Sequence, residues 1–450
     1  MGAIHRRTVL KGAVGATALG GGALSAPAVH GQSKGPYAGT TINGSCFQTT
    51  YFEYLKPFYP EFDDKTGIKV NFNMQAFPVY NQRTDLELST RGSSLDVINV
   101  TFIYSGRWIG AGWLTNLDTF AKDSKMTPGD WDPADFVAGP QSAMQNAKGE
   151  TFGYAWLAGA MILSAARYDL IERAGLSMPK TFDDLIKVCD AVNGKEGVAA
   201  FTADRLHHWN WIPYLMGMGG NVFKAPPDNL TPTLTTPEAV KSAEWYANLL
   251  TKYGPDGVLS YTDDQAMRSQ MSGRANVRTQ DTAWMVPLVT HAESTVQKTV
   301  RFGLMPAGPA GNFPGSNSHA LGIPAGSKKK EAAWEFIKWA LSKQMIARVV
   351  KEHGYPGVCR LSTIESPEFK KVLTLNGQDV ASLYLEVLRL GGKGGYMKYR
   401  TVPIYPQVGD KINKAIERIA TRQQGAADAM KQAQAEAIQD LQKSGIKVDG

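Results

Sequence analysis

Residues 68–74 read IKVNFNM, a stretch in which apolar and polar side chains alternate strictly. Alternation with a period of two is typical of a β-strand that buries one of its faces. A second stretch, LDVINV at residues 95–100, is a short and mainly apolar run, as in a strand that a parallel sheet buries on both faces. The two stretches therefore predict one half-buried and one fully buried strand.

Helical patterns are found farther along the chain. Thr181 and Asp184 have the spacing of a capping box, in which each residue accepts a hydrogen bond from the backbone of the other. Amphipathic helices are also expected at residues 332–341 and 430–441, and Gly445 is expected to end the latter. Strands that alternate with helices predict an α/β fold with largely parallel sheets.

The N-terminus has the pattern of an export signal. Arg6-Arg7 precedes a weakly apolar stretch at residues 12–24, and Ala26-Pro27-Ala28 then gives the small residues that a signal peptidase recognises. This order predicts a twin-arginine signal peptide over residues 1–28, followed by a flexible leader over 29–39. A disordered basic tail is the alternative, but it does not account for the order of the three features. The expected location is the periplasm.

Length and charge restrict the remaining possibilities. The chain has 450 residues, and a single core stops growing at about 250–300 residues, so two domains are expected. No later run is apolar enough to span a membrane, so the mature protein is expected to be soluble. The formal net charge is +7, and Arg6, Arg7 and Lys11 contribute three of those charges within the signal. This mild excess does not favour nucleic acid as a partner.

The three cysteines, Cys46, Cys189 and Cys359, are too few and too irregularly spaced for a disulfide framework. Cys189 falls within the expected helix after Thr181 and is predicted to be a core residue. Pairing of Cys46 with Cys359 is left open.

The sequence lacks the motifs that are typical of catalysis and of cofactor binding. The glycine-rich stretch at 391–395 lacks the Ser or Thr that a phosphate-binding loop needs after its lysine. His207 and His208 are adjacent, so they point in different directions and are poorly placed to share one metal ion. The sequence therefore predicts a protein that is not an enzyme and has neither a cofactor nor a metal. A pair of carboxylates brought together by folding, as in a glycosidase, is left open.

Aromatic residues beside polar residues are the most informative feature of composition. The sequence has 10 Trp, 17 Tyr and 17 Phe, and many of them lie near glycine, proline and polar side chains outside the periodic segments. Each could simply belong to a core. As a set they favour a carbohydrate site, because aromatic rings contact the apolar C–H face of a sugar while polar groups bind its hydroxyls.

Several stretches, taken together, resemble the family-1 extracellular solute-binding proteins of ABC importers, the class that includes maltose-binding proteins. The resemblance covers essentially the whole mature chain. The stretches occur in the order that the family has, and they are GIKV at 67–70, LDVI at 95–98, GWLTNLD at 112–118, GETFGY at 149–154, PKTFDDL at 179–185, GLMPAGP at 303–309, AAWEFI at 332–337 and GYP at 354–356.

The resemblance implies a periplasmic-binding-protein fold of two α/β lobes, each discontinuous in sequence, with a ligand cleft between them. On this basis lobe 1 is expected to comprise residues 40–148 and 304–345, and lobe 2 residues 149–303 and 346–450. The implied function is to bind a solute and to deliver it to the membrane permease, with the protein acting as a monomer. The expected solute is a carbohydrate. A polyol, a glycerophosphodiester or a small organic acid is the alternative ligand, and a periplasmic glycosidase is the alternative function.

Residues expected to contact the ligand follow from the resemblance and from the polar and aromatic pattern. Trp284, Trp211 and Arg360 are predicted to line the cleft from lobe 2, opposite Gln48, Thr101 and Tyr104 from lobe 1. The complete predicted set is Gln48, Thr49, Thr101, Tyr104, Tyr154, Trp156, Trp209, Trp211, Asp281, Trp284, Asn317, His319 and Arg360.

Overall fold

The computed structural model describes residues 35–448, apart from residues 227 and 401. The expected signal peptide at 1–28 and residues 29–34 of the expected leader lie outside the described residues. The first strand begins at Thr40.

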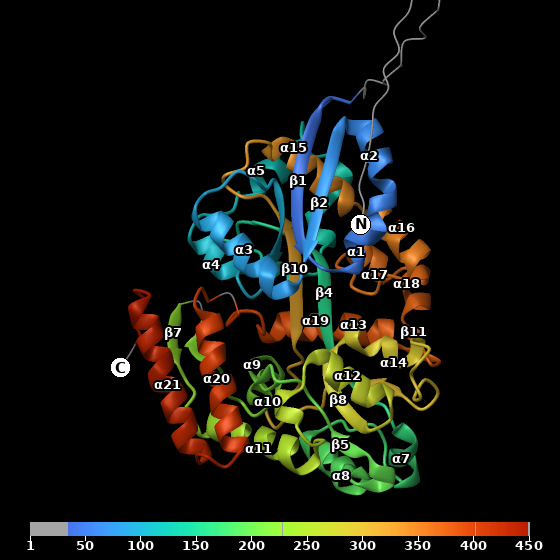
Figure 1. Ribbon diagram of the computed structural model, residues 1–450, viewed down its shortest axis with the longest axis vertical. Helices are drawn as coiled ribbons and strands as arrows, with labels where there is room; N and C mark the ends of the chain where they lie inside the picture. Colours follow the sequence, from blue (N-terminus) through green and yellow to red (C-terminus); the bar gives the residue numbers. More distant parts are fainter. Residues whose placement is uncertain (1–34, 227, 401, 449–450) are drawn as a thin grey trace, which may run out of the picture.

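One mixed sheet runs through the length of the molecule (Figure 1). Its strands lie in the order β2, β1, β3, β10, β4, β8 and β5, and β9 also pairs with β4. Their bounds are β1 (Thr40–Phe47), β2 (Ile68–Gln75), β3 (Val97–Thr101), β4 (Tyr154–Ala165), β5 (Ala199–Phe201), β8 (Ala275–Asp281), β9 (Arg301–Gly303) and β10 (Ser316–Gly322).

The long strand β4 connects the two halves of this sheet. Its residues 154–160 pair with β10, and its residues 161–165 pair with β8. In Figure 1, β4 and β10 run from the upper half of the molecule into the lower half. Lobe 1 is built on β1–β3 and lobe 2 on β5, β8 and β9, so the predicted two-lobed α/β fold is confirmed. Strands are parallel in the outer part of each lobe and antiparallel where the lobes meet.

Helices cover the sheet in both lobes. Those of lobe 1 are α1 (Thr50–Leu55), α2 (Tyr59–Thr66), α3 (Phe77–Ser89), α4 (Ser105–Gly110), α5 (Asp118–Ala121), α6 (Ala138–Ser142), α15 (Lys330–Ala340), α16 (Lys343–His353), α17 (Leu361–Ile364) and α18 (Pro367–Val372). Those of lobe 2 are α7 (Tyr168–Arg173), α8 (Phe182–Val192), α9 (His207–Asn210), α10 (Ile212–Gly217), α11 (Pro237–Tyr253), α12 (Asp263–Met271), α13 (Thr282–Met285), α14 (Pro287–Thr290), α20 (Tyr405–Ala420) and α21 (Ala426–Lys443). The helix α19 (Val380–Gly394) packs against β4, and two small hairpins are formed by β6 (Phe223–Ala225) with β7 (Asn229–Pro232) and by β11 (Thr374–Leu375) with β12 (Gln378–Asp379).

Local signals in the sequence account for several of these elements. Over residues 68–74 of β2 the polar residues are exposed and the apolar ones are buried or half-buried, as the alternation predicts. Every residue of β3 is buried, as expected for the second stretch. The capping box is confirmed at α8, where Thr181 Oγ1 accepts from the backbone N–H of Asp184 at 3.1 Å and Asp184 Oδ2 accepts from the backbone N–H of Thr181 at 3.2 Å.

The lobe boundaries differ from the expected ones after residue 303. The helix α16 was expected in lobe 2 from residue 346 onward, but it packs on lobe 1, where Arg348 pairs with Glu61 at 2.7 Å and the His353 ring stacks 4.3 Å from that of Tyr54. Conversely, Ala310 donates its backbone N–H to the Gly217 carbonyl of lobe 2. The apolar face of α16 must be buried against some core, and the sequence does not say which lobe provides it.

All three cysteines are buried and free. Cys189 is a core residue, as predicted. Within the described part of the chain, no helix is both long and apolar enough to cross a membrane.

Candidate ligand-binding site

A buried carboxylate lies where the two lobes meet. Asp281 ends β8 and begins the short helix α13, and its Oδ1 accepts from the backbone N–H of Ala283 at 2.9 Å. Its Oδ2 accepts from Asn317 Nδ2 of β10 at 2.5 Å. A Cβ atom at Gly159 of β4 would lie 1.6 Å from Asp281 Oδ2, so only glycine at this position leaves room for the pair.

Asp281 and Asn317 can both accept further hydrogen bonds. Burial raises the pKa of Asp281 to about 6, although its hydrogen bonds from Ala283 and Asn317 act in the opposite direction. The carboxylate is therefore mainly ionised at neutral pH and accepts hydrogen bonds only. Asn317 Oδ1 is buried and has no hydrogen-bond partner within the described residues. Both side chains can thus accept from hydroxyl groups of a ligand.

Aromatic rings extend from the end of lobe 1 toward lobe 2. The His319 ring of β10 lies 4.7 Å from that of Phe47 and 5.5 Å from that of Phe102. The Phe102 ring in turn lies 5.6 Å from that of Trp209, which belongs to α9 of lobe 2. Burial lowers the pKa of His319 to about 3, so its imidazole is neutral. These rings give the junction an apolar wall.

A buried arginine completes the contact between the lobes. The guanidinium of Arg400 lies 5.3 Å from the ring centroid of Phe102 and 4.5 Å from that of Trp209. It also donates to the hydroxyl of Tyr399 at 3.2 Å and to the carbonyl of His208 at 3.3 Å. Only 1% of the residue is exposed. Cation–π attraction partly offsets the cost of burying this charge.

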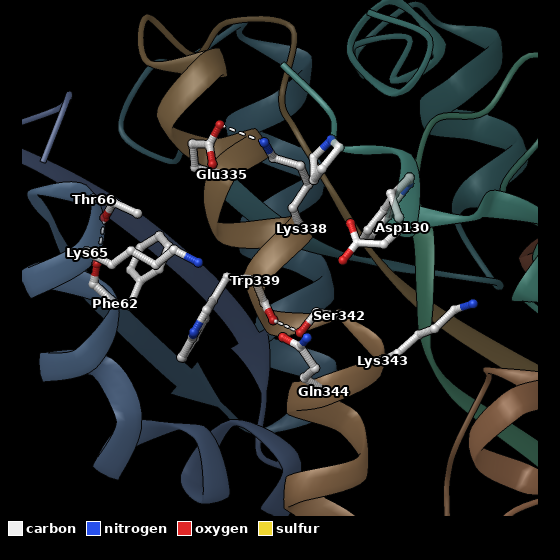
Figure 2. A pocket seen from close by; sticks show the side chains of 12 residues that line it. Phe62, Lys65, Thr66, Asp130, Glu335, Lys338, Trp339, Ser342, Lys343 and Gln344 are labelled. Carbon is white, nitrogen blue, oxygen red and sulfur yellow. Dashed lines mark hydrogen bonds and ion pairs between the residues drawn. The ribbon is translucent and has the colours of Figure 1, made fainter. Parts of the chain in front are cut away.

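A separate groove of about 400 Å³ lies on lobe 1 alone, between α2, α15 and α16 (Figure 2). Two of its three lysines have carboxylate partners: Lys338 pairs with Glu335 at 2.7 Å, and Lys343 pairs with Asp132 at 3.0 Å. Because lobe 2 contributes nothing to it, this groove cannot link ligand binding to lobe closure. Among the residues that the structure describes, no group of three or more His, Cys, Asp or Glu side chains could hold a metal ion.

The family follows from comparison with known proteins. A model of the bacterial extracellular solute-binding proteins matches residues 48–347 of the chain. The chain belongs to this family. Its members are the substrate-binding components of transporters and not enzymes, and they bind small molecules outside the cytoplasm.

Relatives of this solute-binding protein match nearly its whole length. It is 23% identical over 441 residues to a probable amino-acid ABC transporter periplasmic-binding protein of Sinorhizobium fredii, covering 94% of this chain and 96% of the relative. It is 23% identical over 385 residues to the mannitol-binding protein of Pseudomonas aeruginosa, covering 82% and 85% of the two chains. Its fold matches a solute-binding protein of Agrobacterium radiobacter K84 in complex with ribitol, with a TM-score of 0.77, 22% identity and coverage of 89% and 99%.

Three predicted ligand contacts of the solute-binding protein lie inside a lobe, and their contact with a ligand stays a prediction. Tyr154 packs against Trp131 and Trp334 in the core of lobe 1, and Trp211 is fully buried with its indole N–H on Ser242 Oγ at 3.1 Å. Arg360 was expected in lobe 2, but it is fully buried beside lobe 1, where it pairs with Asp135 at 3.1 Å. Trp211 and Arg360 have polar partners inside a lobe, and Tyr154 has aromatic ones. The local sequence pattern does not reveal these contacts.

The structure brings together several other predicted residues. Asp281, Asn317, His319 and Trp209 lie at the junction, and Trp284 projects from α13 with 36% of its surface exposed. Trp156 is buried in lobe 1, where its ring lies 6.1 Å from that of His319. Their contacts with a ligand stay predictions.

The predicted residues of lobe 1 lie at the ends of β1 and β3. Gln48 is exposed, and Thr49 Oγ1 accepts from the backbone N–H of Tyr51 as the cap of α1. Thr101 is buried, and its hydroxyl has no partner in the part of the chain that the structure describes. Tyr104 is half-buried and stacks on Trp108 with 5.6 Å between the ring centroids.

Reasoning from sequence missed four residues that shape the junction. Phe102 and Arg400 join the lobes, Gly159 leaves room for Asp281, and Gln280 binds Trp209. Gln280 directly precedes the predicted Asp281, so proximity in sequence was the available signal for it. The other three become visible only when distant segments pack together.

Proposed function

We propose that this protein binds a carbohydrate, either a sugar or a linear polyol, between its two lobes and delivers it to the membrane permease of an ABC importer. The observation that carries the proposal is the Asp281–Asn317 pair at the junction of the lobes, with an acceptor atom of Asn317 unused. A carboxylate and an amide oxygen beside aromatic rings suit a ligand that has many hydroxyl groups on an apolar carbon skeleton.

The charge at the junction favours a neutral ligand over an acidic one. An ionised Asp281 would repel a carboxylate or phosphate group close to it, which argues against an organic acid or a glycerophosphodiester. The relatives named for mannitol and the structure with ribitol support a polyhydroxylated ligand. The relative named for amino acids makes an amino acid the competitor to be tested.

The ligand is proposed to contact both lobes. Trp284, Trp209 and His319 would provide rings, with Gln48, Thr101 and Tyr104 on the side of lobe 1. A ligand that touches both lobes stabilises the closed arrangement by its differential affinity for that state. The closed surface would then be recognised by the permease.

Export by the twin-arginine route, a monomeric state and the absence of any chemical conversion of the ligand are also parts of the proposal. The arginine pair, the apolar run and the cleavage motif of residues 1–28 support the route. The family's role in transport supports binding without turnover.

A thermal-shift screen of the purified protein tests the ligand class. The panel contains D-mannitol, ribitol, maltose, L-amino acids and glycerophosphodiesters. A specific ligand present at 100 times its Kd is expected to add about 2.7 kcal/mol to the free energy of unfolding. Stabilisation by amino acids alone would overturn the carbohydrate proposal. Mass spectrometry of the bound ligand after incubation tests for turnover, and any product would contradict a pure binding role.

A further inference from the structure

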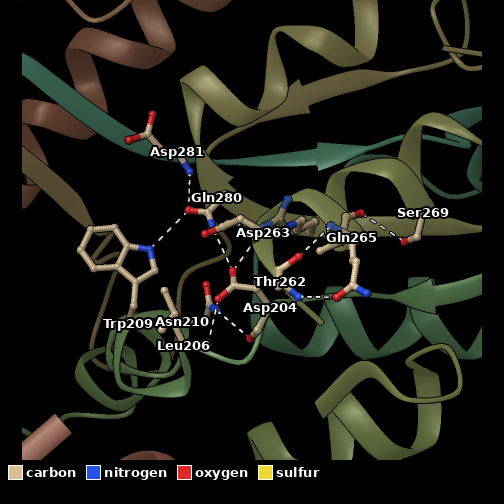
Figure 3. A network of polar contacts seen from close by, with 12 residues as sticks. Asp204, Leu206, Trp209, Asn210, Thr262, Asp263, Gln265, Ser269, Gln280 and Asp281 are labelled. Atoms are coloured by element: carbon tan, nitrogen blue, oxygen red, sulfur yellow. Dashed lines mark hydrogen bonds and ion pairs between the residues drawn. The ribbon is translucent and has the colours of Figure 1, made fainter. Parts of the chain in front are cut away.

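Gln280 has an amide group whose hydrogen-bonding capacity is fully used (Figure 3). Its Oε1 accepts from the indole Nε1–H of Trp209 at 3.3 Å and from the backbone N–H of Asp281 at 2.8 Å. Its Nε2 donates to Asp204 Oδ2 at 2.9 Å and to Asp263 Oδ1 at 2.7 Å. An amide has two donor hydrogens and two acceptor lone pairs, and all four are occupied.

The two carboxylates fix which way this amide points. At least one of the two carboxylates is ionised and can only accept, so Nε2 must face the pair that Asp204 and Asp263 form. Oε1 is then left to face Trp209 and the backbone of Asp281. The side chain of Gln280 thereby holds both the indole of Trp209 and the start of α13.

The carboxylates are themselves held by a buried arginine. Arg278 is fully buried and donates its Nη2 to Asp204 at 3.2 Å and to Asp263 at 2.7 Å. Arg278 and Gln280 are two residues apart on β8, so they share one face of the strand. Asp281 points to the other face, and Figure 3 shows its carboxylate directed away from this network.

The charges of the network balance when it holds one proton. Burial, and then the like charge of Asp204, raise the pKa of Asp263 to about 7. With a proton on the pair, the remaining negative charge compensates Arg278. His207, whose pKa burial lowers to about 4, is neutral nearby. A second carboxylate in place of Gln280 would disturb this balance.

We propose that Gln280 is a positioning residue of the ligand site, which sets the orientation of the Trp209 ring and the backbone of Asp281 for contact with the ligand. This inference rests on the proposed function for the statement that Trp209 and Asp281 meet the ligand. The orientation of Trp209 by Gln280 can be tested without any ligand.

The ligand-free test uses the indole N–H resonance of Trp209 in the ¹⁵N-labelled protein, assigned by its loss in Trp209→Phe. In Gln280→Leu the resonance is expected to shift and its hydrogen to exchange faster, because the acceptor is gone. Gln280→Glu is expected to perturb the resonance too, because the new carboxylate has no N–H to donate to Asp204 and Asp263. The double variant Gln280→Glu/Asp263→Asn supplies an amide donor again and is expected to restore the resonance.

An unchanged resonance in Gln280→Leu, or no restoration in the double variant, would overturn the inference. If Gln280→Leu does not fold, the comparison of Gln280→Glu with the double variant decides.

A second measurement uses D-mannitol, ribitol and maltose as probes of affinity. The probe that stabilises the wild-type protein is used for this measurement. Gln280→Leu is expected to bind it roughly tenfold more weakly, and the double variant is expected to regain most of the lost affinity. Asp264→Asn is the matched control, because Asp264 is an exposed neighbour that pairs only with Arg268 among the described residues. Equal affinity in Gln280→Leu and the wild type would contradict the inference. If no probe binds the wild type, the carbohydrate proposal fails while the indole test still stands.

Discussion

The ring of Phe102 at the end of lobe 1 lies 5.6 Å from the indole of Trp209 in lobe 2. Arg400 lies against both rings, with its guanidinium 5.3 Å from Phe102 and 4.5 Å from Trp209. One aromatic side chain of lobe 1 is therefore the surface on which two side chains of lobe 2 rest. Because this contact crosses the junction, we expect it to favour the arrangement in which the two lobes touch.

Phe102→Ala is expected to favour the open arrangement, because Trp209 and Arg400 lose the ring on which they pack. The radius of gyration of the ligand-free variant, measured by small-angle X-ray scattering, is expected to rise, and ligand affinity to fall. Phe62→Leu is the control, since Phe62 is buried within lobe 1 against Phe336 and Trp339. It is expected to reduce stability without changing the radius. A radius for Phe102→Ala equal to that of the wild type would refute the role of this contact.

Asp281 is expected to make both stability and binding depend on pH. Its pKa is raised to about 6 from an ordinary value of 3.8, so the folded state binds the proton more tightly than the unfolded state. The free energy of unfolding is therefore expected to fall by up to about 3 kcal/mol as the pH rises from about 4 to about 6. Ligand hydroxyls donate to the ionised carboxylate, so affinity is expected to be higher at about pH 7.5 than at about pH 5.

Asp281→Asn is expected to remove the contribution of Asp281 to both dependences, because an amide does not titrate in this range. Asp263, whose pKa burial raises to about 7, keeps its own contribution to the pH dependence of stability. Denaturant titrations and calorimetric binding measurements over the same pH range check the two effects. A pH profile of binding that is identical in the variant would show that another group is responsible.

Trp284→Ala tests whether Trp284 contacts the ligand or belongs to the core. Trp284 is 36% exposed, so the ligand-free melting temperature is expected to change little, while affinity falls by about 1–3 kcal/mol, as for bases that stack on aromatic rings. Trp211→Ala is the contrasting variant, because its buried indole is expected to cost about 3–5 kcal/mol of stability. Unchanged affinity in Trp284→Ala would remove this residue from the site.

Arg360→Met is expected to destabilise the protein by about 3–5 kcal/mol. The substitution leaves Asp135 buried without its cation and removes hydrogen bonds to the carbonyls of Leu341 and Trp131. Ligand affinity is expected to stay unchanged at temperatures where the variant is folded. Arg389→Met is the control, since its ion pair with Glu365 is exposed, and little loss of stability is expected there. A specific loss of affinity in Arg360→Met would restore this residue to the ligand site.

Replacement of Arg6 and Arg7 by lysine is expected to block export of the full-length protein, because the twin-arginine route requires the arginine pair. Cell fractionation with detection of the protein in the periplasm measures the effect. Full export of the double-lysine variant would mean that another route carries the protein.

Particular residues show how far sequence reasoning reached into the site. Asp281 and Trp284 were predicted because polar and aromatic residues follow a strand that the family resemblance identifies, and the structure places Asp281 at the junction and leaves Trp284 partly exposed. Trp211 has the same kind of sequence neighbourhood but is buried against α11, where Ser242 accepts its N–H. The sequence around a residue does not tell whether a helix from a distant part of the chain will bury its side chain.

The sequence by itself determined the α/β class, the two lobes, the family and the strand and helix starts, because periodicity and capping act over a few residues. Tertiary structure alone decided that α16 belongs to lobe 1, that Arg360 is a core ion pair and that Gln280 holds Trp209. Those outcomes depend on contacts such as Gln280 with Asp204, which are 76 residues apart in the chain. Such contacts form only when the whole chain has found the arrangement that buries its apolar faces and pairs its buried polar groups.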